Sequence, residues 1–98
     1  VKRKKINFYY QKLYLNSLYL RIEVKDISGV LSSITKTFAK NKISIKNLIQ
    51  KPNKKNRKAT IFIITHENLE KNYKNLILNL SKNKFLIKKP TFIRIEKV

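Results

Sequence analysis

The order of two apolar spacings along the chain constrains its fold more than any other feature of the sequence. From Ser17 onward, apolar side chains occupy every second position, which predicts a strand with one buried face; they are Leu18, Leu20, Ile22 and Val24. A turn at residues 26–29 follows, and beyond it apolar residues come at helical spacing, at Val30, Leu31, Ile34 and Phe38. We expect Ser28 to be the N-cap of this helix.

The rest of the chain contains a hairpin and then a second helix and strand. A second strand is predicted from residue 43 to residue 50, and a hairpin loop rich in Asn, Pro and charge follows at 51–57. The third strand, at 58–65, is the most apolar and β-branched segment, so we expect a central position with both faces at least partly covered. A second amphipathic helix is predicted at 68–83, with one apolar stripe formed by Leu69, Tyr73, Leu76, Ile77 and Leu80. A last strand is predicted at 91–98, opened by Pro90.

The predicted order of elements is βαββαβ, in one domain at residues 17–98 preceded by a basic linker or tail at 1–16. Right-handed connections arrange this order as a ferredoxin-like fold of the α+β class. It has a four-stranded antiparallel sheet, both helices on one face, and the first and third strands at the centre. Because the first and last strands are then antiparallel neighbours, the pattern Arg21-x-Glu23 and its repeat Arg94-x-Glu96 predict Arg–Glu pairs across the ladder.

The composition excludes several kinds of chemistry. The 98 residues include no Cys and one His, which excludes a zinc finger, a thiolate nucleophile and a histidine-rich metal cluster. The single glycine, Gly29, cannot form the glycine-rich loops that hold nucleotide phosphates. We expect the lone His66 to be a solvated or capping residue, and therefore no catalytic residue and no metal in this segment. No apolar run is long enough to cross a bilayer, so we expect a cytoplasmic location without membrane contact.

The net charge of +19, from 24 Lys and Arg against 5 Asp and Glu, raises the question of an anionic partner. The chain also holds 14 Ile, 20 Lys and 11 Asn, the residues that an AT-rich genome favours, so compositional drift would produce the same charge. Two basic clusters lie in the first sixteen residues and at 51–58, and the remaining charge is scattered. We therefore expect no specific nucleic-acid partner.

A basic RNA-binding module of the same topology remains an alternative. RNA-recognition motifs stack bases on aromatic side chains of the two central strands, and Tyr19 and Phe62 are candidates for such positions. The third strand supplies a basic residue, Phe62 and an aliphatic residue of the usual signature. Thr60 and Thr65 stand where stacking or framing residues are expected.

Four blocks of the sequence carry a family resemblance. They lie in order at residues 19–31, 43–51, 61–66 and 93–96, and the first contains Asp26 followed by Gly29-Val30-Leu31. Together they resemble the C-terminal ACT domain of bacterial homoserine dehydrogenase. The resemblance implies an amino-acid-binding, allosteric module of amino-acid biosynthesis with threonine as effector. The parent enzyme would reduce aspartate semialdehyde with NAD(P)H, and no cofactor would bind to this segment.

The turn after the first strand is the predicted ligand site. A strand that turns through Gly29 into a helix leaves the N–H groups of Gly29, Val30 and Leu31 unpaired, which favours a carboxylate at that point. Asp26 beside them would accept a hydrogen bond from the ammonium group of the ligand. Ordinary turn and capping chemistry explains Asp26 and Ser28 equally well.

The resemblance further implies a site shared by two chains. In related ACT domains the ligand lies at a dimer interface, between this turn and the second strand, whose polar candidates here are Ser44, Asn47 and Gln50. Ser44 stands where the family often has Asn, and Ser28 where it usually has Pro. A dimerisation module without a ligand is therefore a further alternative. In either case we expect a two-fold homodimer, in which the exposed edges of the second strands pair or the helices pack side by side.

Overall fold

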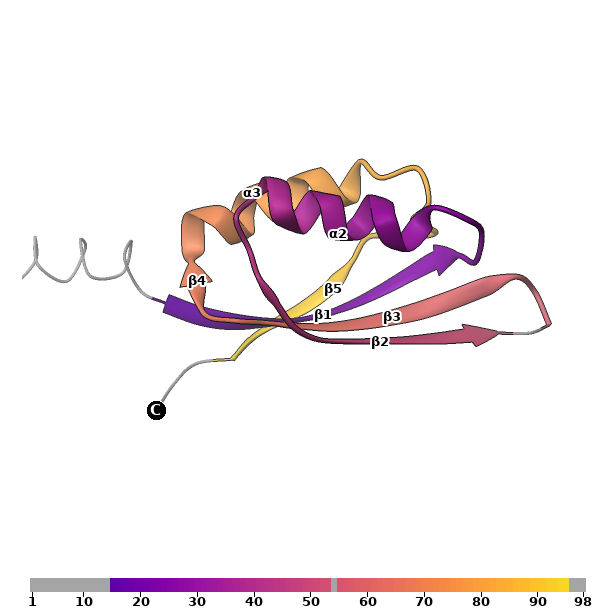
Figure 1. The fold of residues 1–98 in the computed structure, drawn as a ribbon, viewed down its shortest axis with the longest axis horizontal. Coiled ribbons are helices and arrows are strands. Elements are labelled where there is room, and N and C mark those ends of the chain that lie inside the picture. The colour runs from indigo at the N-terminus through magenta and orange to yellow at the C-terminus, as the bar shows by residue number, and fades with distance from the viewer. Residues whose placement is uncertain (1–14, 54, 96–98) are drawn as a thin grey trace, which may run out of the picture.

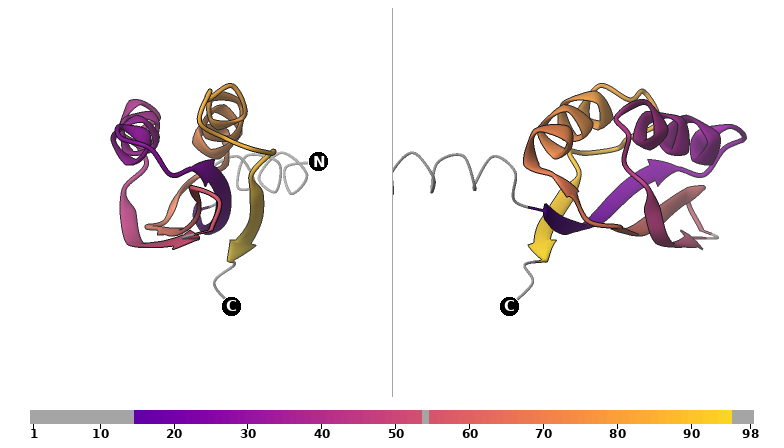
Figure 2. Two further views of the ribbon diagram at one scale, coloured as in Figure 1. Left: turned by 90° about the vertical axis from the view of Figure 1, so that its right-hand side faces the viewer. Right: turned by 60° about the vertical axis from the view of Figure 1, so that its left-hand side comes forward.

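The computed structural model describes residues 15–53 and 55–95. It consists of a curved antiparallel sheet with two helices on one face (Figure 1). The strands are β1 (Leu15–Lys25), β2 (Ile45–Asn53), β3 (Lys58–Thr65), β4 (Asn68–Leu69) and β5 (Thr91–Ile95). The helices are α2 (Val30–Lys40) and α3 (Glu70–Ser81), which lie side by side above the sheet in Figure 2.

The centre of the sheet is formed by β1 and β3. Strand β3 pairs with β1 on one side and with β2 on the other, and β5 pairs with the remaining side of β1. The short β4 pairs with the start of β1, and all of these pairings are antiparallel. The predicted ferredoxin-like α+β fold, with its first and third strands central, is confirmed. In the described part of the chain β2 pairs only with β3, so it is an edge strand.

The hydrophobic core fills the space between the helices and the sheet. Alternate residues of β1 and β3 are buried against the helices, as the two-residue period predicts; they are Leu18, Leu20, Ile22, Val24, Ala59, Ile61 and Ile63. The helices contribute Val30, Ile34, Phe38, Tyr73, Leu76 and Leu80. On the other face of β3, Phe62 and Ile64 are half-buried, which agrees with the expected partial cover of both faces.

Helix α2 begins differently from the prediction. Gly29 is its N-cap, with φ at 90°, and no side chain makes a capping hydrogen bond, so the prediction of Ser28 as N-cap is wrong. The left-handed backbone of Gly29 makes the turn, which puts Ser28 one residue before the cap position. Leu31, expected on the apolar stripe, is exposed.

The hairpin between β2 and β3 is shorter than predicted. Strand β2 continues through residues 51–53, which were expected in the loop, and it starts at Ile45 instead of residue 43. Pro52 is tolerated because β2 is an edge strand, where a missing N–H need not remove a bond of the ladder. A register shift between Ile45 and Asn47 marks a bulge, and it changes the face on which the following residues lie.

Strand β4 was not predicted, and it delays the start of α3. The backbone of Asn68 pairs with Asn16 of β1, which keeps the chain extended at the position where the helix was expected to begin. The side-chain amide of Asn68 also donates to the carbonyl oxygen of Lys42, at 2.7 Å. These contacts account for a helix that starts at Glu70 instead of Asn68.

The predicted Arg–Glu pairs across β1 and β5 are wrong. The register places Arg94 opposite Leu18. Nε of Arg21 instead donates to Oε1 of Glu23 on its own strand at 3.0 Å, and Nε of Arg94 donates to Oε1 of Glu70 on α3 at 2.6 Å. Arg21 thus pairs with Glu23 and Arg94 with Glu70, and neither of these pairs crosses from β1 to β5.

Some predictions fall outside the described residues. These are the linker or tail at 1–14, the end of the last strand at 96–98 and the side chain of Glu96. Residues 15 and 16, also assigned to the tail, are the first residues of β1.

Candidate functional site

The turn between β1 and α2 presents a carboxylate at one end of the sheet. The backbone N–H of Asp26 donates to the carbonyl oxygen of Arg57 at 2.7 Å, which fixes the turn to the β2–β3 hairpin. Asp26 is half-buried, and its carboxylate makes no hydrogen bond or ion pair within the described residues. It is therefore available to a cationic group of a ligand.

The N-terminus of α2 follows the carboxylate and has no cap from a side chain. Its first turn contains no acidic residue, so the positive end of the helix dipole is not neutralised locally. Of the three N–H groups predicted to be unpaired, that of Val30 makes a long hydrogen bond to the carbonyl oxygen of Ile27, at 3.3 Å. Those of Gly29 and Leu31 have no partner among the residues that the structure describes. This end of α2 suits an anion.

The polar residues predicted on the second strand do not share one face. Asn47 lies opposite Ile64 on the uncovered face of the sheet, whereas Gln50 lies opposite the buried Ile61 on the helix-covered face. Ser44 precedes β2 and lines a hollow of about 450 Å³ beside the end of α2. Asn47 and Gln50 are three residues apart, so the alternation of the strand puts them on opposite faces, and the bulge after Ile45 decides which face each one takes.

Within one chain, Ser44 and the turn lie at opposite ends of the sheet. The register aligns Asn53 of β2 with Lys58 of β3, and Lys58 with Lys25 of β1, so β2 ends beside the turn. Ser44 precedes the other end of β2, roughly 30 Å away at about 3.3 Å per residue. An antiparallel pairing of two β2 edges would bring the partner's Ser44 to the end of the sheet where Asp26 lies. The predicted site is therefore complete only with two chains.

Tyr19 and Phe62, the two residues that an RNA-binding module would use to stack bases, lie on the uncovered face of the sheet. The ring centres of Tyr19 and Phe62 are 6.4 Å apart. Arg21 and Lys51 lie 5.9 and 5.8 Å from the ring centre of Phe62, at distances of cation–π contacts. The aromatic surface is thus already engaged by cations of its own chain.

His66 belongs to a structural network. Its backbone N–H donates to the carbonyl oxygen of Ser44 at 2.9 Å, and its carbonyl oxygen accepts from the hydroxyl of Tyr73 at 3.0 Å. Burial raises the pKa of Tyr73; its hydrogen bond with Thr65 opposes this effect, and the nearby Glu70 adds to it. In the described ranges, no three His, Asp or Glu side chains gather as metal ligands, and no helix is long and apolar enough to span a membrane.

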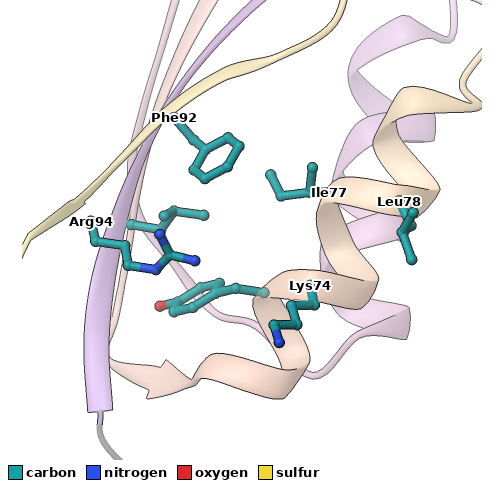
Figure 3. A pocket seen from close by; sticks show the side chains of 7 residues that line it. Lys74, Ile77, Leu78, Phe92 and Arg94 are labelled. Carbon is teal, nitrogen blue, oxygen red and sulfur yellow. The ribbon is translucent and has the colours of Figure 1, made fainter. Parts of the chain in front are cut away.

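The sequence pattern did not reveal a pocket of about 330 Å³ between α3 and β5 (Figure 3). It is lined by Phe92 and Arg94 of β5 and by residues of α3 that include Lys74 and Leu78. The one signal in the sequence was Leu78, an apolar residue outside the predicted stripe.

Comparison with known proteins agrees with this fold. The model of the ACT domain family matches residues 18–83. Homoserine dehydrogenase from Neisseria gonorrhoeae is 37% identical over 81 residues, which are 83% of this chain and 19% of the relative. The Helicobacter pylori homoserine dehydrogenase is 36% identical over 78 residues, 80% of this chain and 18% of the relative.

A solved structure also shows similarity to homoserine dehydrogenase. The crystal structure of a homoserine dehydrogenase from Thiobacillus denitrificans superposes with a TM-score of 0.75 at 30% identity, over 88% of this chain and 19% of that one. The chain thus spans about a fifth of the length of these relatives. The similarities give no support to the RNA-binding alternative. The family model covers both helices, the turn before α2, and the strands β1, β2, β3 and β4. The chain therefore belongs to the ACT domain family, as a regulatory domain resembling that of homoserine dehydrogenase.

Proposed function

We propose that this chain is the threonine-binding regulatory domain of a homoserine dehydrogenase, acting as a homodimer. The observation that carries the proposal is the unpaired carboxylate of Asp26 beside the uncapped N-terminus of α2. An α-amino acid is a zwitterion, whose carboxylate matches the helix start and whose ammonium group matches Asp26. The turn recognises the part of the ligand that all α-amino acids share.

The threonine side chain would be recognised by the second strand of the partner. Ser44 is exposed beside α2, and antiparallel pairing of the β2 edges brings it to the turn of the other chain. Gln50 lies six residues further along β2, roughly 20 Å away at about 3.3 Å per residue, and stays outside the site. A hydrogen-bonding group that faces the threonine hydroxyl disfavours an apolar side chain of similar size, because the polar group would lose its partner. Asn47, on the opposite face, contributes nothing to this arrangement.

The dimer in this proposal forms along β2. An edge strand presents unpaired N–H and C=O groups, and a second copy can pair with them in antiparallel fashion. A two-fold axis between the strands then creates two equivalent sites, each with the turn of one chain and the strand of the other.

The proposal gives this segment a regulatory role in a larger enzyme. The relatives bear the name homoserine dehydrogenase, and the NAD(P) cofactor and the reduction of aspartate semialdehyde would belong to the portion outside this segment. Threonine would then act allosterically, as an end product of aspartate-derived biosynthesis. Because such an enzyme acts on dissolved metabolites, we place it in the cytoplasm.

Titration calorimetry with L-threonine tests the proposal. The wild-type chain should bind one threonine per protomer at millimolar concentrations or below. Asp26→Asn should abolish the heat of binding. Glu70→Gln removes one negative charge from α3, where the carboxylate pairs with Arg94 of β5, and should leave threonine binding unchanged.

Serine and isoleucine serve as comparison ligands. Serine keeps the hydroxyl, and isoleucine keeps the branched shape without it, so both should bind more weakly than threonine. If none of the three produces heat with the wild-type chain, the turn is not an amino-acid site and the chain is a dimerisation module. If Asp26→Asn binds threonine as well as wild type does, the proposed contact between the ammonium group of threonine and the carboxylate of Asp26 is refuted.

A further inference from the structure

The pocket between α3 and β5 has the size and lining of a small-molecule site. Its volume of about 330 Å³ lies at the lower end of the range of roughly 300–1,000 Å³ for ligand pockets. Leu18 and Tyr73, both buried, form its floor. Ile77 of α3 points across the space toward Phe92 of β5, as Figure 3 shows, and Leu78 lines the outer edge of the pocket.

Its walls expose apolar surface that the fold leaves uncovered. Leu78 is 60% exposed, and Phe92 on the opposite wall is 38% exposed. Covering apolar surface stabilises a complex by roughly 25 cal/mol per Å². An apolar body of the right size would therefore gain contacts on both walls at once.

The charged groups at the mouth select an anion. Arg94 extends from β5 into the space between strand and helix, and its guanidinium carbon lies 5.8 Å from the ring centre of Phe92. Nε of Arg94 donates to Oε1 of Glu70, so one of the two cations at the mouth is balanced by an acid. Lys74 of α3 is exposed and adds a further positive charge. The mouth has a net positive charge, while the interior is apolar.

From this arrangement we propose that the pocket binds an apolar monocarboxylate, with an aliphatic or aryl body of about six to ten carbon atoms. The carboxylate lies at Lys74 and Arg94, and the body lies between Ile77 and Phe92, with Leu78 at the outer edge. Free α-amino acids are disfavoured, because the lining residues include no carboxylate and Glu70 at the mouth is already paired with Arg94, so a buried ammonium group would lack a partner. The site is thus separate from the turn at Asp26 and does not depend on the proposed binding of threonine.

Titration with octanoate, followed by amide NMR shifts, tests the pocket directly. Octanoate below its micellar concentration should give saturable shifts confined to α3, β5 and the start of β1. Octylammonium, with the same body and the opposite charge, should give none of these shifts. Lys74→Gln should weaken octanoate binding about three- to tenfold, as expected for loss of a charge-assisted contact.

Lys71→Gln is the matched control, since Lys71 is exposed on the same helix and does not line the pocket. It should change the dissociation constant less than twofold. Leu78→Asp, at an exposed position that folding tolerates, should abolish binding. Equal weakening by the two lysine variants, or shifts spread over the basic surface, would show general attraction to the +19 chain and overturn the proposal.

A second copy of the chain is the other conceivable occupant of these walls. If the chain dimerises through them, light scattering will show that Leu78→Asp dissociates the dimer, and octanoate will fail to bind to wild type. That result overturns the small-molecule site. Octanoate binding in a chain that gives no heat with threonine would refute the proposed function and leave this inference standing.

Discussion

The phenol oxygen of Tyr73 on α3 lies 2.8 Å from Oγ1 of Thr65 on β3, in the buried layer between helix and sheet. The hydroxyl of Tyr73 donates to the carbonyl oxygen of Asn16 at 2.5 Å, so the hydroxyl of Thr65 donates to the phenol oxygen, and Oγ1 of Thr65 accepts from the N–H of Leu18 at 2.9 Å. The four groups form one hydrogen-bonded chain, which joins α3, β3 and the start of β1. It holds α3, and with it one wall of the α3–β5 pocket, against the sheet.

Removing the phenol hydroxyl should destabilise the protein measurably. Tyr73→Phe leaves the hydroxyl of Thr65 and the carbonyl of Asn16 without this buried partner, which should lower the free energy of unfolding by about 1–2 kcal/mol. Urea denaturation measures the change. Tyr19→Phe, on the uncovered face, should cost less than about 0.5 kcal/mol. Equal losses for the two variants would show that the buried network adds no stability.

The raised pKa of Tyr73 predicts a pH dependence above the neutral range. Burial favours the neutral phenol, so the folded pKa lies above the ordinary value of about 10. The contribution of Tyr73 to the free energy of unfolding is complete below about pH 10. It is lost as the pH rises from there through the pKa of Tyr73 in the folded protein. Wild type and Tyr73→Phe have the same lysines, so the difference between their free energies of unfolding depends on Tyr73 alone. This difference should shrink above about pH 10. A constant difference across that range would contradict the prediction.

The backbone at Gly29 predicts a distinct pair of mutational effects. Gly29 has φ at 90°, and a Cβ added there would meet no atom within 4 Å, so substitution strains the backbone without a clash. Gly29→Ala should cost about 1–2 kcal/mol in the free energy of unfolding. Gly29→Asn should cost less, because Asn tolerates the left-handed region. Chemical denaturation that ranks the two variants in the opposite order would refute this explanation.

The positive charge predicts weak binding to RNA that depends on salt and not on sequence. Counterion release alone drives such binding, so moderate salt should abolish it. Phe62→Ala should leave it unchanged in filter-binding or fluorescence anisotropy measurements, since the ring already contacts Arg21 and Lys51. A sequence-specific complex that survives physiological salt and is lost in Phe62→Ala would support base stacking instead.

The central strands were predictable from the sequence because their burial is one-sided. Every second residue of β1 and β3 packs on the helices, so the two-residue period is strong in both. The residues at which helices and strands begin and end were harder to predict, because they depend on single hydrogen bonds and dihedral angles. The extended backbone of Asn68 and the left-handed Gly29 are examples, and the apolar period contains no information on either.

The candidate site was predictable in part. Asp26 and the helix start are adjacent in sequence, so their proximity follows from the chain itself. The face of Asn47 does not, because the bulge after Ile45 reverses the alternation that the sequence suggests. The α3–β5 pocket depends on how Phe92 and Leu78 meet in space, and these residues belong to elements that are separated along the chain.

Mixing two inactive variants tests the central claim, that threonine binds between the turn of one chain and the second strand of another. Asp26→Asn removes the carboxylate that the turn offers to threonine. Ser44→Tyr blocks the half of the site on the second strand, at an exposed position. Calorimetry should find no threonine binding to either variant alone. After the two are refolded together, half of the dimers should be mixed, each with one intact site, so binding should return at about a quarter of the wild-type stoichiometry. A mixture that stays silent while wild type binds threonine, or full binding by Ser44→Tyr alone, would contradict the shared site.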